Sequence, residues 1–292
     1  MLKTISLTII VLLTAIQIVC ATTLKQIKKQ GVLRHLGVKY ANFNTGAGDG
    51  LDTELMQLFA AHLGVKYQHV PTSFATVITD LTGIKIVHKG TDIDITGSTT
   101  PKGDIIANGL TILPWRKKLI NYSTPIFPTQ VWLVARSDST LQPIIPSKNT
   151  DQDIQTVRAL INGVKILSKE NTCLDAKLYN LSCTGAEVEY FSGGLGELTP
   201  AMIQGFAEAT LIDTPNALLA LEKWGSMIKV IGPVSKFQGM GVGFTKDALK
   251  LMENFNAFLS ELKRNGTMYK LVDKYYPLAF QFYPEFFKDL KK

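Results

Sequence analysis

The stretch GLDTELMQLFAAHLGVKYQHV, from Gly50 to Val70, decides the fold because it joins a helix to a strand. Its apolar residues recur at steps of three and four positions, as on one face of a helix, at Leu51, Leu55, Leu58, Phe59 and Leu63. Gly64 follows the last of them, where a glycine commonly ends a helix. Val65–Val70 then has the composition of a strand. A helix that leads directly into a strand favours a layered α/β fold.

The same alternation continues on both sides of this stretch. The early part of the chain predicts strands at Val32–Val38 and Asp104–Leu110, with a helix at Phe74–Leu81 between them. A second series of strands and helices follows at Val164–Leu167, Leu174–Leu181, Val188–Phe191, Leu198–Phe206, Ala209–Ile212 and Pro215–Leu221. Two amphipathic helices, Leu249–Lys263 and Met268–Tyr275, come last. Such alternation predicts sheets that are largely parallel.

Two segments suggest that the chain crosses between domains. The proline-bracketed segment Pro125–Asp138 leads into the second series, and Lys229–Phe244 leads back. We therefore predict two α/β lobes, with residues 22–128 and 236–292 in lobe 1 and residues 129–235 in lobe 2. Between residues 83 and 103, the alternation in TDIDITGST predicts a surface hairpin, to which we assign no chemistry.

The first 21 residues have the pattern of a secretory signal peptide. Met1–Lys3 is basic, Ile5–Val19 is almost unbroken apolar sequence, and small residues follow. An alternative is a lipoprotein acylated at Cys20. Either interpretation predicts an exported protein, located in the periplasm or outside the cell.

Composition limits the class of protein further. About 270 residues follow the leader, and 46% of all residues are apolar, which is enough for a large core and argues against disorder. The formal charge of +7 comes from scattered basic residues, without the basic stripe interleaved with aromatics that nucleic-acid binding needs. We expect no nucleic-acid partner.

The cysteines lead to a second expectation that follows from export. If cleavage removes Cys20, Cys173 and Cys183 remain in an oxidising compartment, where a pair tends to form a disulfide. The alternative is two buried free thiols.

Several cofactor and catalytic motifs are missing from the sequence or fail on context. Gly239–Gly243 resembles a dinucleotide loop, but its surroundings indicate glycines within strands. The four histidines lack the spacing of zinc ligands, and no G-x-S-x-G elbow or P-loop occurs. We expect no metal and no cofactor.

Four segments together resemble the exported solute-binding proteins of the amino-acid ABC transporter family. They are VLRHLGVKYANF, GLDTELMQLFAAHLGVKYQHVPTSF, KGDIIANGLTILPWRKKLINYSTPIFPTQVWLVAR and KDALKLMENFNAFLSELKRNGTMYKLVDKYYP. The resemblance implies a type II periplasmic binding fold, in which each lobe is a mostly parallel sheet flanked by helices. It also implies a two-strand hinge, near Pro128–Trp132 and Pro233–Phe237, and a monomer that closes around a small ligand and docks onto a membrane permease.

The stretch NGLTILPWRKK contains the residue that would hold the ligand carboxylate. An amino acid is a zwitterion, so a water-poor cleft must pair both of its charges. Arginine offers a planar fork that binds a carboxylate with two hydrogen bonds. By resemblance, Arg116 and Thr111 bind the carboxylate, and Gly109 offers its carbonyl to the ammonium. The alternative for Arg116 is a surface charge beside Lys117 and Lys118.

The opposite charge is expected from the second lobe. Asp213 ends a predicted strand just before a helix, and ligands of open α/β sheets collect at such strand ends. By resemblance Asp213 binds the α-ammonium, and the alternative is a helix N-cap. Tyr40, Phe43 and Phe74 match family positions that cover the ligand, although each could equally be a core residue.

The loop SKENTC departs from the family pattern. Where the family commonly has a glycine- and threonine-containing loop, this chain has Lys169 and Glu170, followed by Asn171 and Thr172 as possible donors. The two charges suggest a polar or charged ligand side chain, or a ligand that is not an ordinary amino acid.

Two other classes of function share the predicted fold. One is an exported enzyme, either dehydratase-like or related to the front domain of murein transglycosylases, for which Glu170 is the only additional carboxylate near the cleft. The other is a sensory module that presents its ligand to a receptor. We expect a binding protein and not an enzyme.

Overall fold

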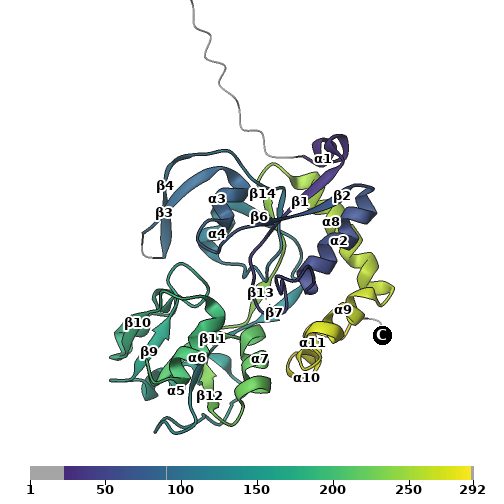
Figure 1. Ribbon diagram of the computed structural model, residues 1–292. Helices are drawn as coiled ribbons and strands as arrows, with labels where there is room; N and C mark the ends of the chain where they lie inside the picture. Colours follow the sequence, from purple (N-terminus) through teal and green to yellow (C-terminus); the bar gives the residue numbers. More distant parts are fainter. Residues whose placement is uncertain (1–22, 90, 291–292) are drawn as a thin grey trace, which may run out of the picture.

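The computed structural model describes residues 23–89 and 91–290, and the chain forms two α/β lobes (Figure 1). Each lobe is built on one five-stranded sheet, with strand order β2-β1-β5-β14-β6 in the first and β10-β9-β11-β8-β12 in the second. The predicted signal peptide and Cys20 lie outside the described residues. In the part of the chain that is described, no helix is both long enough and apolar enough to cross a membrane.

The first sheet combines strands from both ends of the chain. Its strands are β1 (Val32–Gly37), β2 (Lys66–Pro71), β5 (Ile105–Ile106), β6 (Ile120–Tyr122) and β14 (Gly243–Thr245). β1 runs parallel to β2 and β5, whereas β14 runs antiparallel to β5 and β6. The predicted strand at Asp104–Leu110 is thus much shorter, because the chain turns at Gly109 (φ 64°). Leu110 and Thr111, which follow this turn, are both buried.

The first lobe contains eight helices in the described residues. They are α1 (Leu24–Gln30), α2 (Leu51–Leu63), α3 (Val77–Thr82), α4 (Pro114–Leu119), α8 (Leu249–Arg264), α9 (Thr267–Tyr275), α10 (Ala279–Phe282) and α11 (Pro284–Phe287). Of these, α2, α3, α8 and α9 match predicted helices, and the short α10 and α11 lie beside Phe127 and the second lobe. In α2, Leu55 and Phe59 are buried, and Gly64 ends the helix with a left-handed conformation. Leu58 is an exception to the predicted apolar face, since it is 38% exposed.

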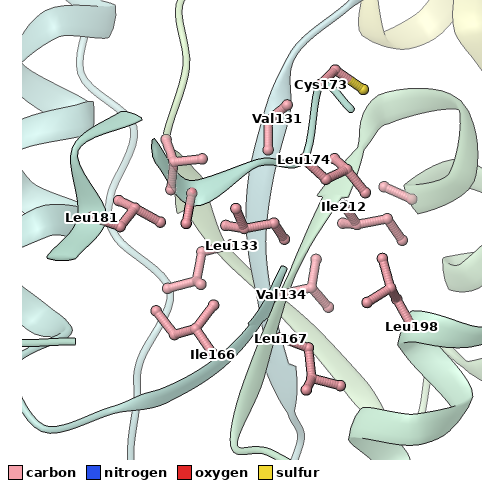
Figure 2. Packing of buried hydrophobic residues seen from close by; sticks show 14 of the residues in the cluster. Val131, Leu133, Val134, Ile166, Leu167, Cys173, Leu174, Leu181, Leu198 and Ile212 are labelled. Carbon is pink, nitrogen blue, oxygen red and sulfur yellow. The ribbon is translucent and has the colours of Figure 1, made fainter. Parts of the chain in front are cut away.

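The second sheet is formed by one continuous part of the chain. Its strands are β8 (Val131–Arg136), β9 (Lys165–Ser168), β10 (Glu187–Tyr190), β11 (Ala209–Asp213) and β12 (Ile228–Pro233). Its helices and 3-10 turns are α5 (Thr150–Leu160), η1 (Ala176–Tyr179), η2 (Leu181–Thr184), η3 (Leu195–Glu197), α6 (Leu198–Ile203) and α7 (Thr214–Trp224). Figure 2 shows side chains of β8, β9 and β11, including Leu133, Ile166 and Ile212, packed together in its core.

The predicted helix at Leu174–Leu181 is wrong. The segment forms the two 3-10 turns η1 and η2, which are separated by Asn180 in the left-handed conformation (φ 50°). A residue with this conformation interrupts a right-handed helix, and apolar spacing alone does not reveal it.

Two antiparallel strands link the lobes. They are β7 (Phe127–Thr129), which continues into β8, and β13 (Gln238–Met240), which follows β12. Gly239 lies in β13 and Gly243 in β14, which confirms that these glycines belong to strands and not to a dinucleotide loop. Buried apolar residues form a continuous cluster that includes Trp115 of the first lobe and Ile212 of the second, so the lobes are packed together.

Residues 83–103 form the predicted hairpin. Its strands are β3 (Ile84–Lys89) and β4 (Asp92–Ser98), which pair antiparallel and belong to neither five-stranded sheet. In Figure 1 the hairpin projects from the first lobe on the side where β9 and β10 of the second lobe lie. Lys118 of α4 contacts Asp92 of β4 at 2.6 Å, which ties the hairpin to the helix that carries Arg116.

Candidate functional site

Arg116 is a buried charge on the first lobe. The residue is only 2% exposed, whereas Lys117 and Lys118 of the same helix are exposed, so the surface-charge interpretation is wrong. Its Nη1 donates to the Thr111 carbonyl at 3.0 Å, and its guanidinium lies 5.2 Å from the centre of the Trp115 ring. Its Nε has no hydrogen-bond partner among the described residues. A buried guanidinium with an unused Nε–H donor is prepared to bind an anion.

Asp213 is a buried charge on the second lobe. It ends β11, occupies the N-cap position of α7 and is 1% exposed. Its side chain makes no capping hydrogen bond, and instead accepts one from Asn216 Nδ2 at 3.1 Å. Burial raises the pKa of the Asp213 carboxyl, and the hydrogen bonds from Tyr40 and Asn216 oppose that shift. A cation placed beside this carboxylate would be strongly favoured.

Tyr40 connects the two lobes at this point. Its hydroxyl donates to Asp213 Oδ2, although Tyr40 belongs to the first lobe and Asp213 to the second. Burial, and then the charge of Asp213, raises the pKa of Tyr40 well above its usual value, which keeps the hydroxyl a donor. The structure therefore describes an arrangement in which the lobes are closed on each other.

Cys173 lies in the same region, and the predicted disulfide is wrong. Both thiols are free, with Cys173 buried and Cys183 exposed in η2. The Cys173 Sγ is 3.7 Å from Asp213 Oδ2, and Figure 2 shows the residue at the edge of the core of the second lobe. Burial and Asp213 raise the pKa of Cys173 to about 12, whereas Thr111 and Arg116 of the first lobe act to lower it. The thiol thus interacts with charged and polar groups of both lobes.

The Gly109 turn brings Thr111 close to the opposite lobe. The backbone N–H of Gly109 donates to Asp52 Oδ2 at 2.7 Å, which holds the turn against α2. A Cβ at Gly109 would lie 2.6 Å from the Phe43 ring and 2.9 Å from the Tyr40 ring, so the close packing requires glycine here. Thr111 itself is buried.

The three predicted aromatic residues have different positions. Tyr40 stacks on Phe43 with ring centres 5.9 Å apart, and Phe74 meets Tyr40 edge-on at 5.3 Å. Phe43 is fully buried and packs edge-on against Phe127, so its position is that of a core residue. Phe74 is only partly buried and lines a cavity between the lobes.

This cavity has a volume of about 340 Å³. It is lined by Phe74 and Ala75 of the first lobe and by Lys169, Glu170, Asn171, Thr172, Tyr190, Phe191 and Ser192 of the second. The Thr172 hydroxyl donates to the Lys169 carbonyl at 2.8 Å, and the Asn171 N–H donates to Asp175 Oδ2 at 3.0 Å. The Thr172 hydroxyl and the Asn171 backbone N–H are therefore already engaged within the loop.

Sequence reasoning missed two residues of this region. Asp52 is buried at the start of α2, although it is not one of the apolar residues that mark the predicted buried face of this helix. His88 of the hairpin meets the Trp115 ring edge-on at 4.6 Å. Burial and Arg116 lower the pKa of His88, whereas Asp175 and Glu170 of the second lobe oppose that shift. His88 attracts notice in the sequence only as a possible zinc ligand, and nothing there indicates that it would meet Trp115.

No group of three or more His, Cys, Asp or Glu residues suited to a metal ion occurs within residues 23–89 and 91–290.

The fold and this site between two packed lobes define the class of two-lobed type II binding proteins. The family "Bacterial extracellular solute-binding proteins, family 3" matches residues 83–277, and the chain belongs to this family. It is similar to the L-cystine-binding protein TcyJ of Escherichia coli (strain K12), with 24% identity over 87% of this chain and 85% of the relative.

Solved structures of similar proteins have the same fold. The structure of holo ArgBP from T. maritima is 24% identical, with a TM-score of 0.63 over 82% of this chain and 93% of that one. The ancestral amino acid-binding protein AncCDT-1, described as a precursor of cyclohexadienyl dehydratase, is 23% identical, with a TM-score of 0.67 over 87% of this chain and 100% of that one.

Proposed function

We propose that the protein is an exported solute-binding protein that captures an amino acid, or a similar small zwitterion, by closure of its two lobes. The observation that carries the proposal is the burial of opposite charges on opposing lobes, Arg116 on α4 and Asp213 at the end of β11. Cys173 supports a single site for both charges, because its sulfur lies 3.7 Å from Asp213 Oδ2 and the charge of Arg116 acts to lower its pKa. The family and a relative that binds L-cystine support the same class of ligand.

The assignment of roles follows from charge and geometry. Arg116 binds the ligand α-carboxylate, with help from Thr111, because a guanidinium fork matches a carboxylate and its Nε is unused. Asp213 binds the α-ammonium. The ammonium then contacts the same carboxylate to which the Tyr40 hydroxyl donates in this structure. Tyr40 and Phe74 cover the ligand, and Gly109 contributes its backbone. The Asn171 backbone N–H and the Thr172 hydroxyl become donors to the ligand only if their loop rearranges, whereas the Asn171 side chain lies in the cavity lining as a further donor.

Closure requires a hinge, which we assign to the two linking strands, β7 and β13. We place the lobe boundaries at residues 128/129, within β7, and at residues 235/236, between β12 and β13. A ligand that contacts Arg116 and Asp213 at once favours the closed form, because only there are both partners within reach. We also propose that residues 1–21 direct export and that the protein acts as a monomer. The closed form would then deliver its ligand to a membrane permease.

An enzyme remains the second candidate because AncCDT-1 is named as a precursor of a dehydratase. The structure gives it little support, since Glu170 forms an exposed ion pair with Lys177 at 2.6 Å and is not poised as a buried general acid. Incubation of the protein with cyclohexadienyl and amino-acid substrates, followed by product analysis, separates the two.

The direct test is a screen of the purified mature protein against the common amino acids, cystine and diamino acids by thermal shift, followed by calorimetric titration of the best ligands. The proposal predicts saturable binding that raises the melting temperature. It is wrong if no zwitterion binds and a neutral solute, such as a sugar, does.

A further inference from the structure

The cavity between Phe74 and the SKENTC loop adjoins the site of the two buried charges. Phe74 packs against Tyr40, whose hydroxyl donates to Asp213. Thr172 lines the cavity and directly precedes Cys173, whose sulfur contacts the same carboxylate. Its volume of about 340 Å³ lies within the range of roughly 300–1,000 Å³ that is usual for small-molecule sites. A ligand held by its α-carboxylate and α-ammonium would therefore extend its other end into this cavity.

The lining of the cavity carries both signs of charge on adjacent residues. The Lys169 ammonium donates to the carbonyls of Phe191 at 3.0 Å and Ser192 at 2.9 Å, which fixes its position with two of its three N–H groups. Glu170 uses Oε1 to bind Lys177 at 2.6 Å. Each residue thus retains capacity for a further partner, the ammonium as a donor and the carboxylate as an acceptor.

This pairing of charges discriminates between ligand side chains. An apolar side chain would remove water from both charges without replacing their hydrogen bonds, which is costly. A side chain with one charge would satisfy one residue and approach the like charge of the other. A second end with both an amine and a carboxylate would satisfy both residues at once. Phe74 and Tyr190 supply apolar surface for the segment that joins the two ends.

We propose that the ligand is a double-headed amino acid, with one zwitterionic end between Arg116 and Asp213 and a second zwitterionic end between Lys169 and Glu170. The proposal rests on the proposed function, because it extends the same cleft from one end of the ligand to the other. Lys169 binds the second carboxylate, and Glu170 binds the second ammonium. The two residues that depart from the family pattern in this loop thereby become the determinants of specificity.

The test uses four compounds that share one carbon skeleton or most of it. Diaminopimelate carries both charges at its second end, lysine lacks the second carboxylate, 2-aminopimelate lacks the second ammonium, and 2-aminohexanoate lacks both. Lanthionine and cystine provide double-headed probes with other spacers. Calorimetric titration of the full mature protein with each compound is expected to give at least tenfold tighter binding for one or more double-headed probes than for any single-headed one.

Variants then assign each end to its partner. Lys169→Met is expected to weaken binding of the best double-headed probe at least tenfold while leaving lysine unaffected. Glu170→Gln is expected to do the same while leaving 2-aminopimelate unaffected. The matched controls Lys148→Met and Glu222→Gln replace exposed residues outside the cavity and should leave every affinity unchanged.

The outcomes separate this proposal from the proposed function. Single-headed amino acids could bind as tightly as every double-headed probe, with their binding abolished in Arg116→Ala. The proposed site at Lys169 and Glu170 would then be wrong, whereas the proposed binding of an amino acid between Arg116 and Asp213 would stand. Equal loss of lysine and double-headed binding in Lys169→Met would show a structural role and also overturn the second-end site. If no amino acid of either kind binds, both proposals fail.

Discussion

The two lobes bring different kinds of charge to the cleft. Arg116 of the first lobe is held by groups of its own lobe, the Thr111 carbonyl and the Trp115 ring. Asp213 of the second lobe is hydrogen-bonded by Asn216 of its own lobe and by Tyr40 of the other. If Arg116 has the proposed role, the first lobe has a preformed carboxylate site, whereas the environment of Asp213 is completed only by closure. This difference suggests that the first lobe binds the ligand initially and the second lobe secures it.

The largest effect is expected from Arg116→Ala. A buried ligand carboxylate that loses its partner costs about 3–5 kcal/mol, equivalent to roughly two to three and a half decades of affinity. Titration of the best amino-acid ligand measures the change, with Lys117→Ala as the control on the exposed side of α4. Near-native affinity in Arg116→Ala would refute the preformed carboxylate site.

Asp213→Asn is expected to have a smaller effect on affinity. The asparagine still accepts a hydrogen bond from Tyr40, but loses the charge that pairs with the ammonium, at a cost of about 2–3 kcal/mol. The dissociation rate should rise more than the association rate falls, because initial binding uses the first lobe. Stopped-flow measurements distinguish the two rates. An effect confined to association would reverse the proposed order of the lobes.

Asp52→Asn is expected to change the free energy of unfolding by about 2 kcal/mol. Asp52 accepts a hydrogen bond from the Gly109 N–H and so holds the turn that precedes Thr111. Burial raises the pKa of Asp52 to about 7, and the Gly109 N–H opposes the shift. Because the folded pKa lies above the unfolded one, the stabilisation is present below about pH 4 and is lost as pH rises through 7. Asparagine keeps the acceptor for Gly109 without a charge, so the variant should be more stable than the wild type at pH 8.

Denaturant unfolding at pH 5 and pH 8 measures this difference, with Asp94→Asn as an exposed control. The variant is compared with the wild type at each pH because the contribution of His35 to stability changes with pH in the opposite direction to that of Asp52. Burial lowers the pKa of His35 to about 4, so its contribution is lost as pH falls from about 6.5. Equal destabilisation of Asp52→Asn at both pH values would contradict a charge penalty at this position.

The smallest change is expected from chemical labelling of the two thiols. The exposed Cys183 should react with iodoacetamide first, whereas the buried Cys173 should react only when the lobes open. Saturating ligand should slow the second reaction further and leave the first unchanged, as followed by peptide mass spectrometry. Rapid labelling of Cys173 in the presence of ligand would mean that closure does not cover the second-lobe site.

The positions of the two central charges could be predicted from the sequence because local patterns mark them. Arg116 follows a turn, a proline and a tryptophan, and Asp213 stands between an apolar strand and a helix. The α/β alternation likewise followed from apolar periodicity. These features depend on neighbours in the chain, which a sequence displays directly.

Features that depend on distant contacts could not be predicted. The cysteine count suggested a disulfide, but the fold directs Cys173 toward Asp213 and leaves Cys183 at the surface. Asp52 belonged to the polar side of a helical pattern, yet the Gly109 turn covers it. His88 and its neighbours in the hairpin gave no indication that they would face Trp115 and the charges of the second lobe.

The most direct test of the account is a thermodynamic cycle between the ligand carboxylate and Arg116. The best amino-acid ligand and its α-carboxamide are titrated into the wild type and Arg116→Ala. The account predicts that the wild type loses at least a hundredfold in affinity with the amide, and that Arg116→Ala binds the two compounds almost equally. An amide penalty that is the same in both proteins would show that Arg116 does not bind the carboxylate, and would contradict the account.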